Sequence, residues 1–391
     1  MSDKTPPPLA SLQELKTALQ LAVGLELSTI PVYLTALYSI KDGHNTEATQ
    51  TIRGVVMEEM LHMTLAANVL NALGETPSVE PVVFRGKHLQ PIPSYPMTSP
   101  LVSGIGELKL RPLCPEAVNG FVAIEHPLHG HARMADIPLG TCLYQTIGQF
   151  YEAIRTALKD TGICKDADFK HSNQVPDTQY YGGAGHVIEV KDRASAVKAI
   201  ETIIEEGEGL PEVKLHDKAK TVTDDDRLRN GWQMYSHYAR FRELQTGRRF
   251  RSTQTAAEEP TGAMVLVDYS AVHPALHVPR NGDTEGGAES AALIEFDLAY
   301  TQLVDDLYRV FSGGAKDVRY TLPTGDGAVA KPALPRAVHR MYALKYMAVA
   351  LMRMPNPASP GHTLCPRFSY VETGDREKLR TIADEQREVN R

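Results

Sequence analysis

The apolar and polar positions in the N-terminal part of the chain predict two long helices. Residues 11–40 are predicted to be helical and are apolar almost throughout from Thr17 onward, and in residues 47–73 apolar side chains recur at steps of three and four. The segment KDGHN separates the two stretches, and Gly74 and Pro77 end the second one. Because the turn between them is short, the two helices must run antiparallel as a helical hairpin.

Helical periodicity returns in shorter stretches farther along the chain. They cover about residues 115–125, 143–158, 193–208, 224–247, 293–312 and 334–354. Residues 78–114 are rich in proline and glycine and include the alternating piece ELKLRPL, which indicates loop with some extended structure. The chain is therefore predicted to be mainly α-helical. We expect a helical bundle with long irregular inserts in residues 11–250, a helical extension packed on it in residues 251–370, and a charged tail in residues 371–391.

The first predicted helix contains a single ionisable acid in its apolar part. Glu26 is the one charged side chain between Thr17 and Ile40. A helix this apolar is buried on most sides, and a lone carboxylate there is costly unless it is paired, protonated or bound to a metal ion. Taken alone, Glu26 fits either a metal ligand or a neutral or salt-bridged core glutamate.

The second predicted helix carries a carboxylate and an imidazole inside its apolar stripe. Glu59 and His62 are three residues apart and share one helix face, so they can present an oxygen and a nitrogen to one ion. The adjacent Glu58 is expected at the surface or behind the ligands. A Glu-x-x-His pair is common by chance, but facing a buried glutamate it predicts a metal site. Di-iron carboxylate bundles combine such pairs with glutamates from the other helices.

A two-metal site needs further ligands from later helices. Glu152 is the candidate in the third helix, although it lies beside the apolar stripe and a solvent-facing position is the alternative. The fourth helix offers Glu205 and Glu208, for which an acidic solvated face is the alternative. His237 lies in an apolar stripe and is either the missing nitrogen ligand or a core histidine. Tyr33 is expected near the bundle centre, where it either hydrogen-bonds a ligand or packs.

Composition and missing motifs exclude several classes of function. The 48 acidic and 41 basic residues give a formal net charge of −7, so there is no bulk case for nucleic acid or an anionic membrane as partner. The 4 cysteines form no Cys-x-x-Cys pair, which argues against a zinc ribbon or a disulfide framework and favours a reducing cytoplasm. We expect no signal peptide and no membrane span. The absence of a phosphate loop and of Gly-x-Ser-x-Gly argues against nucleotide hydrolysis and serine-esterase chemistry.

Two strings of the sequence point to a known family. LELSTIPVYLTALYSIK, followed by IRGVVMEEMLHMTLAANVLNALGETP, resembles the ferritin-like domain of the iminophenyl-pyruvate dimer synthase type. That domain is named for the bisindole-forming enzymes of violacein and rebeccamycin biosynthesis and also occurs in stand-alone proteins. The similarity covers most of residues 11–370. It implies a ferritin-like four-helix bundle with additional C-terminal helices.

The resemblance also implies a set of metal ligands. By motif, the ligand positions of the family fall on Glu26, Glu59, His62, Glu152, Glu208 and His237. Glu205 and Tyr33 are expected to support them, and Glu125, which matches a further family position, is expected to be structural beside Pro127. Glu206 stands where the family more often has Gln and adds negative charge near the site. The bisindole synthases are much longer chains, so their haem-dependent coupling does not carry over.

A ligand set of carboxylates and imidazoles suits two iron ions, or manganese, rather than a four-coordinate structural zinc. We therefore expect an oxygen-dependent non-haem di-iron oxidoreductase of natural-product biosynthesis. Its partners would be dioxygen and a small amine, amino acid or indole-like metabolite, without nucleic acid or membrane, and a homo-oligomer is compatible with the sequence. The alternatives are a ferritin-like protein that binds metal or ligand without turnover, and a bundle that holds no metal.

Overall fold

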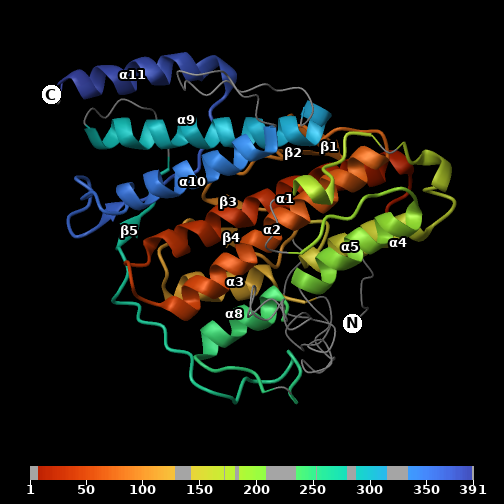
Figure 1. Ribbon diagram of the computed structural model, residues 1–391, viewed down its shortest axis with the longest axis horizontal. Helices are drawn as coiled ribbons and strands as arrows, with labels where there is room; N and C mark the ends of the chain where they lie inside the picture. The colour runs from red at the N-terminus through yellow and green to blue at the C-terminus, as the bar shows by residue number, and fades with distance from the viewer. Residues whose placement is uncertain are drawn as a thin grey trace.

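The computed structural model describes residues 8–127, 142–170, 172–180, 185–207, 235–251, 253–279, 288–314 and 333–389 and is dominated by helices (Figure 1). The helices are α1 (Leu12–Ser39), α2 (Thr46–Ala72), α3 (Pro115–Ile124), α4 (Ile147–Lys159), α5 (Arg193–Gly207), α8 (His237–Thr246), α9 (Ala288–Arg309), α10 (Ala333–Leu351) and α11 (Arg376–Val389). The mainly α-helical bundle predicted from the sequence is confirmed.

α1 and α2 form the predicted antiparallel hairpin at the centre of the molecule (Figure 1). α1 begins at Ser11, whose hydroxyl accepts a hydrogen bond from the Glu14 N–H. By length and composition α1 could cross a membrane, but 83% of its most apolar 18-residue window is buried inside the protein. Burial of that extent is what a central core helix requires, because protein packs on nearly all of its sides.

α4 and α5 form a second hairpin that completes a four-helix bundle. α4 contacts α1 and α5 contacts α2, and Figure 1 shows the second pair alongside the first. Burial of Phe150, Ile154 and Leu158 places the apolar stripe of α4 against the bundle interior. α4 starts at Ile147, four residues later than the periodicity predicts, because Thr146 caps it by accepting from the Gln149 N–H.

α3 and α8 pack on each other and also contact the central hairpin, α3 against α1 and α8 against α2. The predicted helix 224–247 is observed as α8, which starts at His237, whereas residues 208–234 lie outside the described residues. The N-cap of α8 is Ser236, whose hydroxyl accepts a hydrogen bond from the Ala239 N–H, and its C-cap is Gly247, whose φ of 68° is the left-handed conformation that suits glycine. This pair therefore adds side chains from two more elements to the bundle.

The C-terminal helices form a layer beside α1 (Figure 1). α10 contacts both α1 and α9, and α11 packs on the outer side of α9. The sequence predicted a charged tail after residue 370, but Arg376–Val389 is a helix. Its few apolar side chains, Leu379, Ile382 and Ala383, pack against Ile294 and Leu298 of α9. An apolar stripe this narrow is easily missed among charged residues.

Short strands pair within the inserts. β1 (Val82–Phe84) pairs with β2 (Lys87–Leu89), and β3 (Met97–Thr98) pairs with β4 (Glu107–Leu108), both antiparallel. β5 (Ala275–Leu276) and β6 (Thr363–Leu364) are parallel and join the segments before and after α9 and α10. The extended stretch predicted around ELKLRPL is thus reduced to the two residues of β4.

One of these inserts approaches α1 so closely that only glycine fits. A Cβ atom at Gly24 would lie 2.9 Å from Pro91 Cα and closer still to the Pro91 carbonyl oxygen. Both opposing atoms belong to the backbone, so no side chain can move aside. Gly120 in α3 offers the opposite case, because a Cβ there would meet no atom within 4 Å.

We expect Gly24→Ala to lower the free energy of unfolding by about 1–3 kcal/mol, since the added methyl overpacks the contact with Pro91. The matched change Gly120→Ala should raise it by about 0.5–1 kcal/mol, because alanine favours the helix and meets no clash. Chemical denaturation followed by circular dichroism measures both values. An increase in stability for Gly24→Ala would show that α1 and the insert are farther apart than observed.

Candidate metal centre

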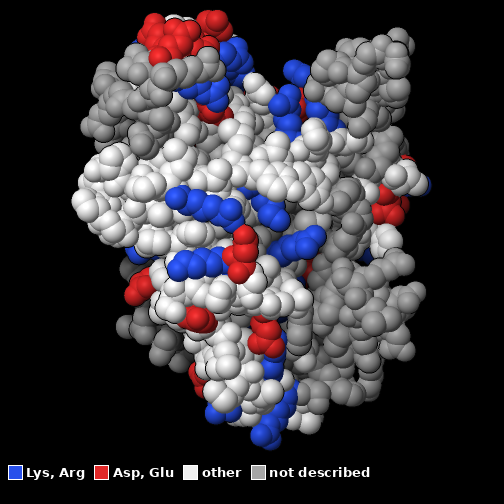
Figure 2. Space-filling view, turned by 60° about the vertical axis from the view of Figure 1, so that its left-hand side comes forward, with Lys and Arg blue, Asp and Glu red and all other residues white. Residues whose placement is uncertain are grey.

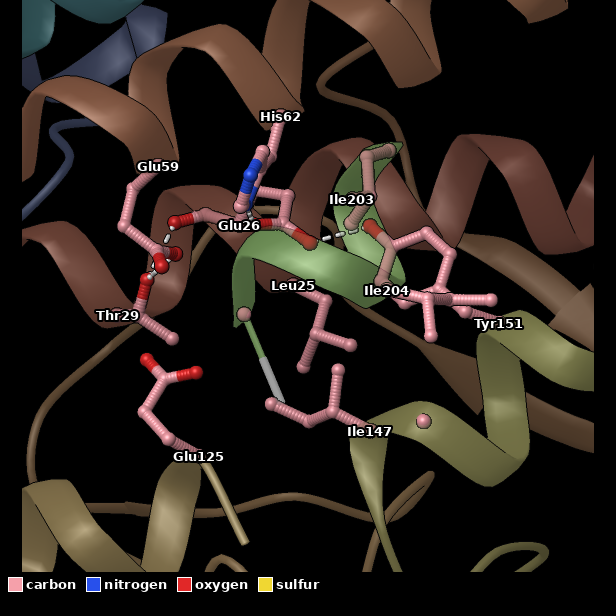
Figure 3. A pocket seen from close by; sticks show the side chains of 12 residues that line it. Leu25, Glu26, Thr29, Glu59, His62, Glu125, Ile147, Tyr151, Ile203 and Ile204 are labelled. Atoms are coloured by element: carbon pink, nitrogen blue, oxygen red, sulfur yellow. Dashed lines mark hydrogen bonds and ion pairs between the residues drawn. The ribbon is translucent and has the colours of Figure 1, made fainter. Parts of the chain in front are cut away.

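Ligand-type side chains from α2 and α8 meet inside the bundle. The candidate ligand atoms of Glu59, His62 and His237 all lie within 4.8 Å of one another, and all three residues are buried. Glu26 reaches the same point from α1, and Glu125 reaches it from the end of α3 (Figure 3). Ligands around one ion at bond lengths of about 2.0–2.2 Å span about 4 Å, so this spacing suits cation binding.

His62 lies between two carboxylates. Its Nδ1 is 3.7 Å from Glu26 Oε2, and its Nε2 is 3.0 Å from Glu206 Oε2 of α5. Burial lowers the pKa of His62, but hydrogen bonds to Glu206 and Glu26 outweigh it and raise that pKa to about 10. Glu26 also accepts a hydrogen bond from the Tyr151 hydroxyl of α4. In the absence of a cation the imidazole of His62 is therefore charged at neutral pH.

His237 has a corresponding environment in α8. Its Nε2 is 2.7 Å from Glu58 Oε2, and its Nδ1 is 2.8 Å from Glu59 Oε1 and 3.5 Å from Glu125 Oε1. Burial opposes the charged form, but Glu125, Glu58 and Glu59 raise the pKa of His237 well above its usual range. The Nδ1 atom is poorly aligned for a hydrogen bond to Glu59 despite the short distance, and it has no hydrogen-bond partner among the described residues. A buried nitrogen in that position is suited to a cation.

The two histidines thus divide the cluster into two similar halves, with Glu59 shared between them. Each imidazole has one carboxylate toward the centre of the cluster and another on its far side, and the two rings stack with centroids 5.2 Å apart. Thr29 donates a hydrogen bond of 2.6 Å to the second oxygen of Glu59. The Tyr33 hydroxyl donates to Glu125 Oε1. These bonds fix the carboxylates that face one another.

Negative charge exceeds positive charge in this cluster. Its carboxylates are those of Glu26, Glu58, Glu59, Glu125 and Glu206. Arg240 is the one arginine or lysine of the described residues that pairs with any of them, and it binds Glu58. Burial raises the pKa of Glu59 and the charge of Glu26 raises it further, whereas Arg240 and His237 outweigh burial and lower the pKa of Glu58. An excess of buried carboxylate is costly unless protons or cations compensate it.

Four of the six predicted ligands are brought together by the structure: Glu26, Glu59 and His62 from the central hairpin, and His237 from α8. Tyr33 lies beside them, as predicted, through its bond to Glu125. The fifth, Glu208, lies outside the described residues.

The sixth predicted ligand, Glu152, is placed elsewhere. Its carboxylate is 2.7 Å from Arg155 on the same helix and is 30% exposed. The neighbouring Tyr151 faces the centre instead, because successive side chains of a helix point about 100° apart. The structure therefore assigns the inward position of α4 to a hydrogen-bond donor for Glu26 rather than to a carboxylate ligand.

The other positions around the two histidines are occupied by acids that were not predicted to be metal ligands. Glu205 is exposed, and the next residue, Glu206, contacts His62. Glu125, expected to be only structural, faces His237, and Glu58, expected at the surface or behind the ligands, is buried against it. The signal for Glu125 was its spacing of four from the buried Phe121, which continues the apolar face of α3.

Comparison with known proteins agrees with the resemblance seen in the motifs. A sequence profile described as Ferritin-like matches residues 19–246. Dichlorochromopyrrolate synthase of Lentzea aerocolonigenes is 23% identical over 339 residues, which cover 76% of this chain but only 30% of the synthase. The crystal structure of a ferritin-like protein from Caulobacter vibrioides at 1.95 Å resolution superposes with a TM-score of 0.60 at 22% identity, covering 93% of this chain and 100% of that one. The last likeness shows a common fold.

Substitution of His237 tests whether the cluster binds metal, and substitution of Glu152, which lies away from the cluster, is the control. We expect His237→Ala to weaken the binding of Mn²⁺ or Fe²⁺ by at least about 10–100-fold, because a nitrogen ligand is lost. Glu152→Gln should leave the affinity within about twofold, since Glu152 pairs with Arg155 away from the cluster. Anaerobic calorimetry, with circular dichroism to verify folding, measures both. Equal losses in the two variants would place Glu152 among the ligands.

Metal binding should release protons. A cation that takes a nitrogen of His62 must displace the proton held there, and the pKa of about 10 keeps that proton in place at neutral pH. The affinity for a divalent cation should therefore rise between about pH 7 and pH 9. Calorimetry in two buffers of different ionisation enthalpy counts the released protons. Heats that do not depend on the buffer would contradict a site built on charged imidazoles.

Proposed function

The chain belongs to the ferritin-like family, and from this premise we propose that it is an oxygen-dependent non-haem di-iron oxidoreductase. We further propose that it acts on a small amine, amino acid or indole-like metabolite in a biosynthetic pathway. The observation that carries the proposal is the buried cluster in which Glu59 lies between His62 and His237. A purely structural network would need only enough carboxylates to pair with the two histidines, and this interior holds more than that.

Charge balance favours two cations over one. Four buried carboxylates and the 31% exposed Glu206 surround the two imidazoles, against the single guanidinium of Arg240. With both imidazoles neutral, two divalent ions bring this set of five to zero charge, whereas one leaves a net charge of about −2. A buried cluster is most stable near neutrality, because uncompensated charge in a medium of low dielectric constant is costly.

The two halves of the cluster suggest which residues would hold each ion. Glu26 and His62 would bind one, Glu125 and His237 would bind the other, and Glu59 lies where it would contact both. Mixed oxygen and nitrogen donors suit iron, with manganese as the nearest alternative. When bound in the ferrous state, the pair supplies the electrons that reduce dioxygen.

Other residues of the chain would orient the ligands. Glu206 and Glu58 hold the outer nitrogens of the two imidazoles and so fix the ring orientations. Tyr33 and Tyr151 donate hydrogen bonds to Glu125 and Glu26. Burial, together with the nearby carboxylates, raises the pKa of both tyrosines well above the usual range. They therefore keep their protons and remain hydrogen-bond donors at neutral pH.

The cavity beside the centre is small and has apolar walls. It has a volume of about 20 Å³ and is lined by Leu25, Ile147, Ile203 and Ile204 in addition to the polar cluster (Figure 3). A space of this size holds about one water-sized molecule, which suits dioxygen. Apolar walls limit the entry of further water. An organic substrate would need side chains of α4 or α5 to move.

The name of a relative supports a biosynthetic role. The protein from Lentzea aerocolonigenes is a synthase, although this chain spans less than a third of its length. A ferritin-like protein that binds metal without turnover is the alternative, and it shares the same cluster. Consumption of dioxygen distinguishes the oxidoreductase from the binding protein.

The test is oxygen uptake by iron-loaded protein. After anaerobic reconstitution with Fe²⁺, we expect the protein to consume dioxygen in the presence of amines, amino acids or indoles, and the zinc-loaded protein to consume none. Glu59→Gln should lower the rate by at least about 10–100-fold, and Glu152→Gln should retain it. Full iron loading without uptake for any of these substrates would favour the binding protein, and failure to bind iron would exclude both.

A further inference from the structure

A second and much larger cavity lies on the other side of α2 from the metal centre. It has a volume of about 570 Å³ and lies between α1, α2 and α10. Small-molecule sites typically measure about 300–1,000 Å³. None of its lining residues also lines the 20 Å³ cavity at the centre. The two cavities are separate features of the bundle.

The floor of the large cavity is apolar and adaptable. Val56 and Met63 of α2 are buried there, together with Phe311, which follows α9. Met57, Met60 and Met341 form half-buried walls. Methionine side chains are flexible and polarizable, so they fit apolar ligands of varied shape. This floor suits a hydrocarbon or aromatic body.

The rim of the cavity is cationic. Its exposed lining residues include Lys41, Arg53 and Lys345, and the acid among them, Asp42, is already paired with Arg353 at 2.6 Å. Neither Arg53 nor Lys345 pairs with a carboxylate in the part of the chain that the structure describes. Figure 2 shows basic side chains gathered in the middle of one face of the molecule, with few acidic ones among them. Basic groups at the mouth of an apolar cavity attract an anion.

We propose that this cavity binds an amphipathic organic carboxylate. Its apolar body occupies the floor formed by Val56, Met63 and Phe311, and its carboxylate meets Arg53 and Lys345 at the rim. A carboxylate can form ion pairs with these two exposed cations, which a neutral apolar molecule cannot. The inference does not rest on the proposed oxidase activity, because the cavity is complete without a metal ion.

Binding can be measured on the metal-free protein with a fluorescent anion. We expect saturable binding of 8-anilinonaphthalene-1-sulfonate and its displacement by palmitate, with hexadecanol at least roughly tenfold weaker, since it lacks the charge. Lys345→Glu should weaken palmitate binding by roughly tenfold or more. Lys378→Glu, an equal charge reversal on the exposed side of α11, should leave it within about twofold.

A second pair of variants tests the cavity itself. Val338 of α10 lines it, whereas Ala343 of the same helix is exposed and does not. Val338→Trp should narrow the space and weaken binding by roughly tenfold or more, and Ala343→Trp should leave it within about twofold, with circular dichroism to verify folding of both. The proposal is overturned if hexadecanol competes as well as palmitate, or if neither Val338→Trp nor Lys345→Glu affects binding. Iron loading and oxygen uptake, measured separately, report on the metal centre alone.

Discussion

Glutamates from four separate elements bring their negative charges together inside the bundle, and the rest of the structure holds them there. Glu26 comes from α1, Glu59 from α2, Glu125 from the end of α3 and Glu206 from α5. Glu26, Glu59 and Glu125 are buried, and none of them is stable alone in an apolar interior, whereas Glu206 is partly exposed. Each is tolerable because it contacts an imidazole or a hydroxyl donor, and the two imidazoles become cations in response. The cluster is therefore a single unit, in which the charge state of any one member depends on the others.

The burial of α1 follows from its position between two layers. One side of the helix faces α4 and the metal centre, where Leu25, Glu26 and Thr29 line the small cavity. The other side faces α10, where Leu34 and Leu37 line the large one. A helix that packs on both sides must be apolar almost throughout, which explains why α1 has the composition of a membrane span although 83% of its most apolar window is buried in the protein. The C-terminal helices thus allow the apolar first helix to exist in a folded chain.

The sequence predicted the parts of the site that interrupt an apolar pattern. Glu26 and the Glu59–His62 pair stand out because their helices are long and strongly patterned, so their inward direction follows from periodicity. Glu152 and Tyr151 show the limit of the method, because α4 is short and one residue of helix rotation decides which of them faces inward. Glu125 comes just after the last residue of α3, so its spacing of four from Phe121 indicates an inward direction only if the helix extends that far. α11 was missed for a related reason, since its contact with α9 needs only three apolar side chains.

The two halves of the candidate metal centre are alike in their residues but not in their surroundings. On the His237 side, Glu58 is 3% exposed and bound by Arg240, so its charge is fixed and water has no access to it. On the His62 side, Glu206 is 31% exposed, and no arginine or lysine among the described residues binds it. A carboxylate that touches solvent can change its partner at little cost, whereas one bound to a buried guanidinium cannot. Water therefore reaches the candidate site more readily from the His62 half, and the His237 half is its rigid side.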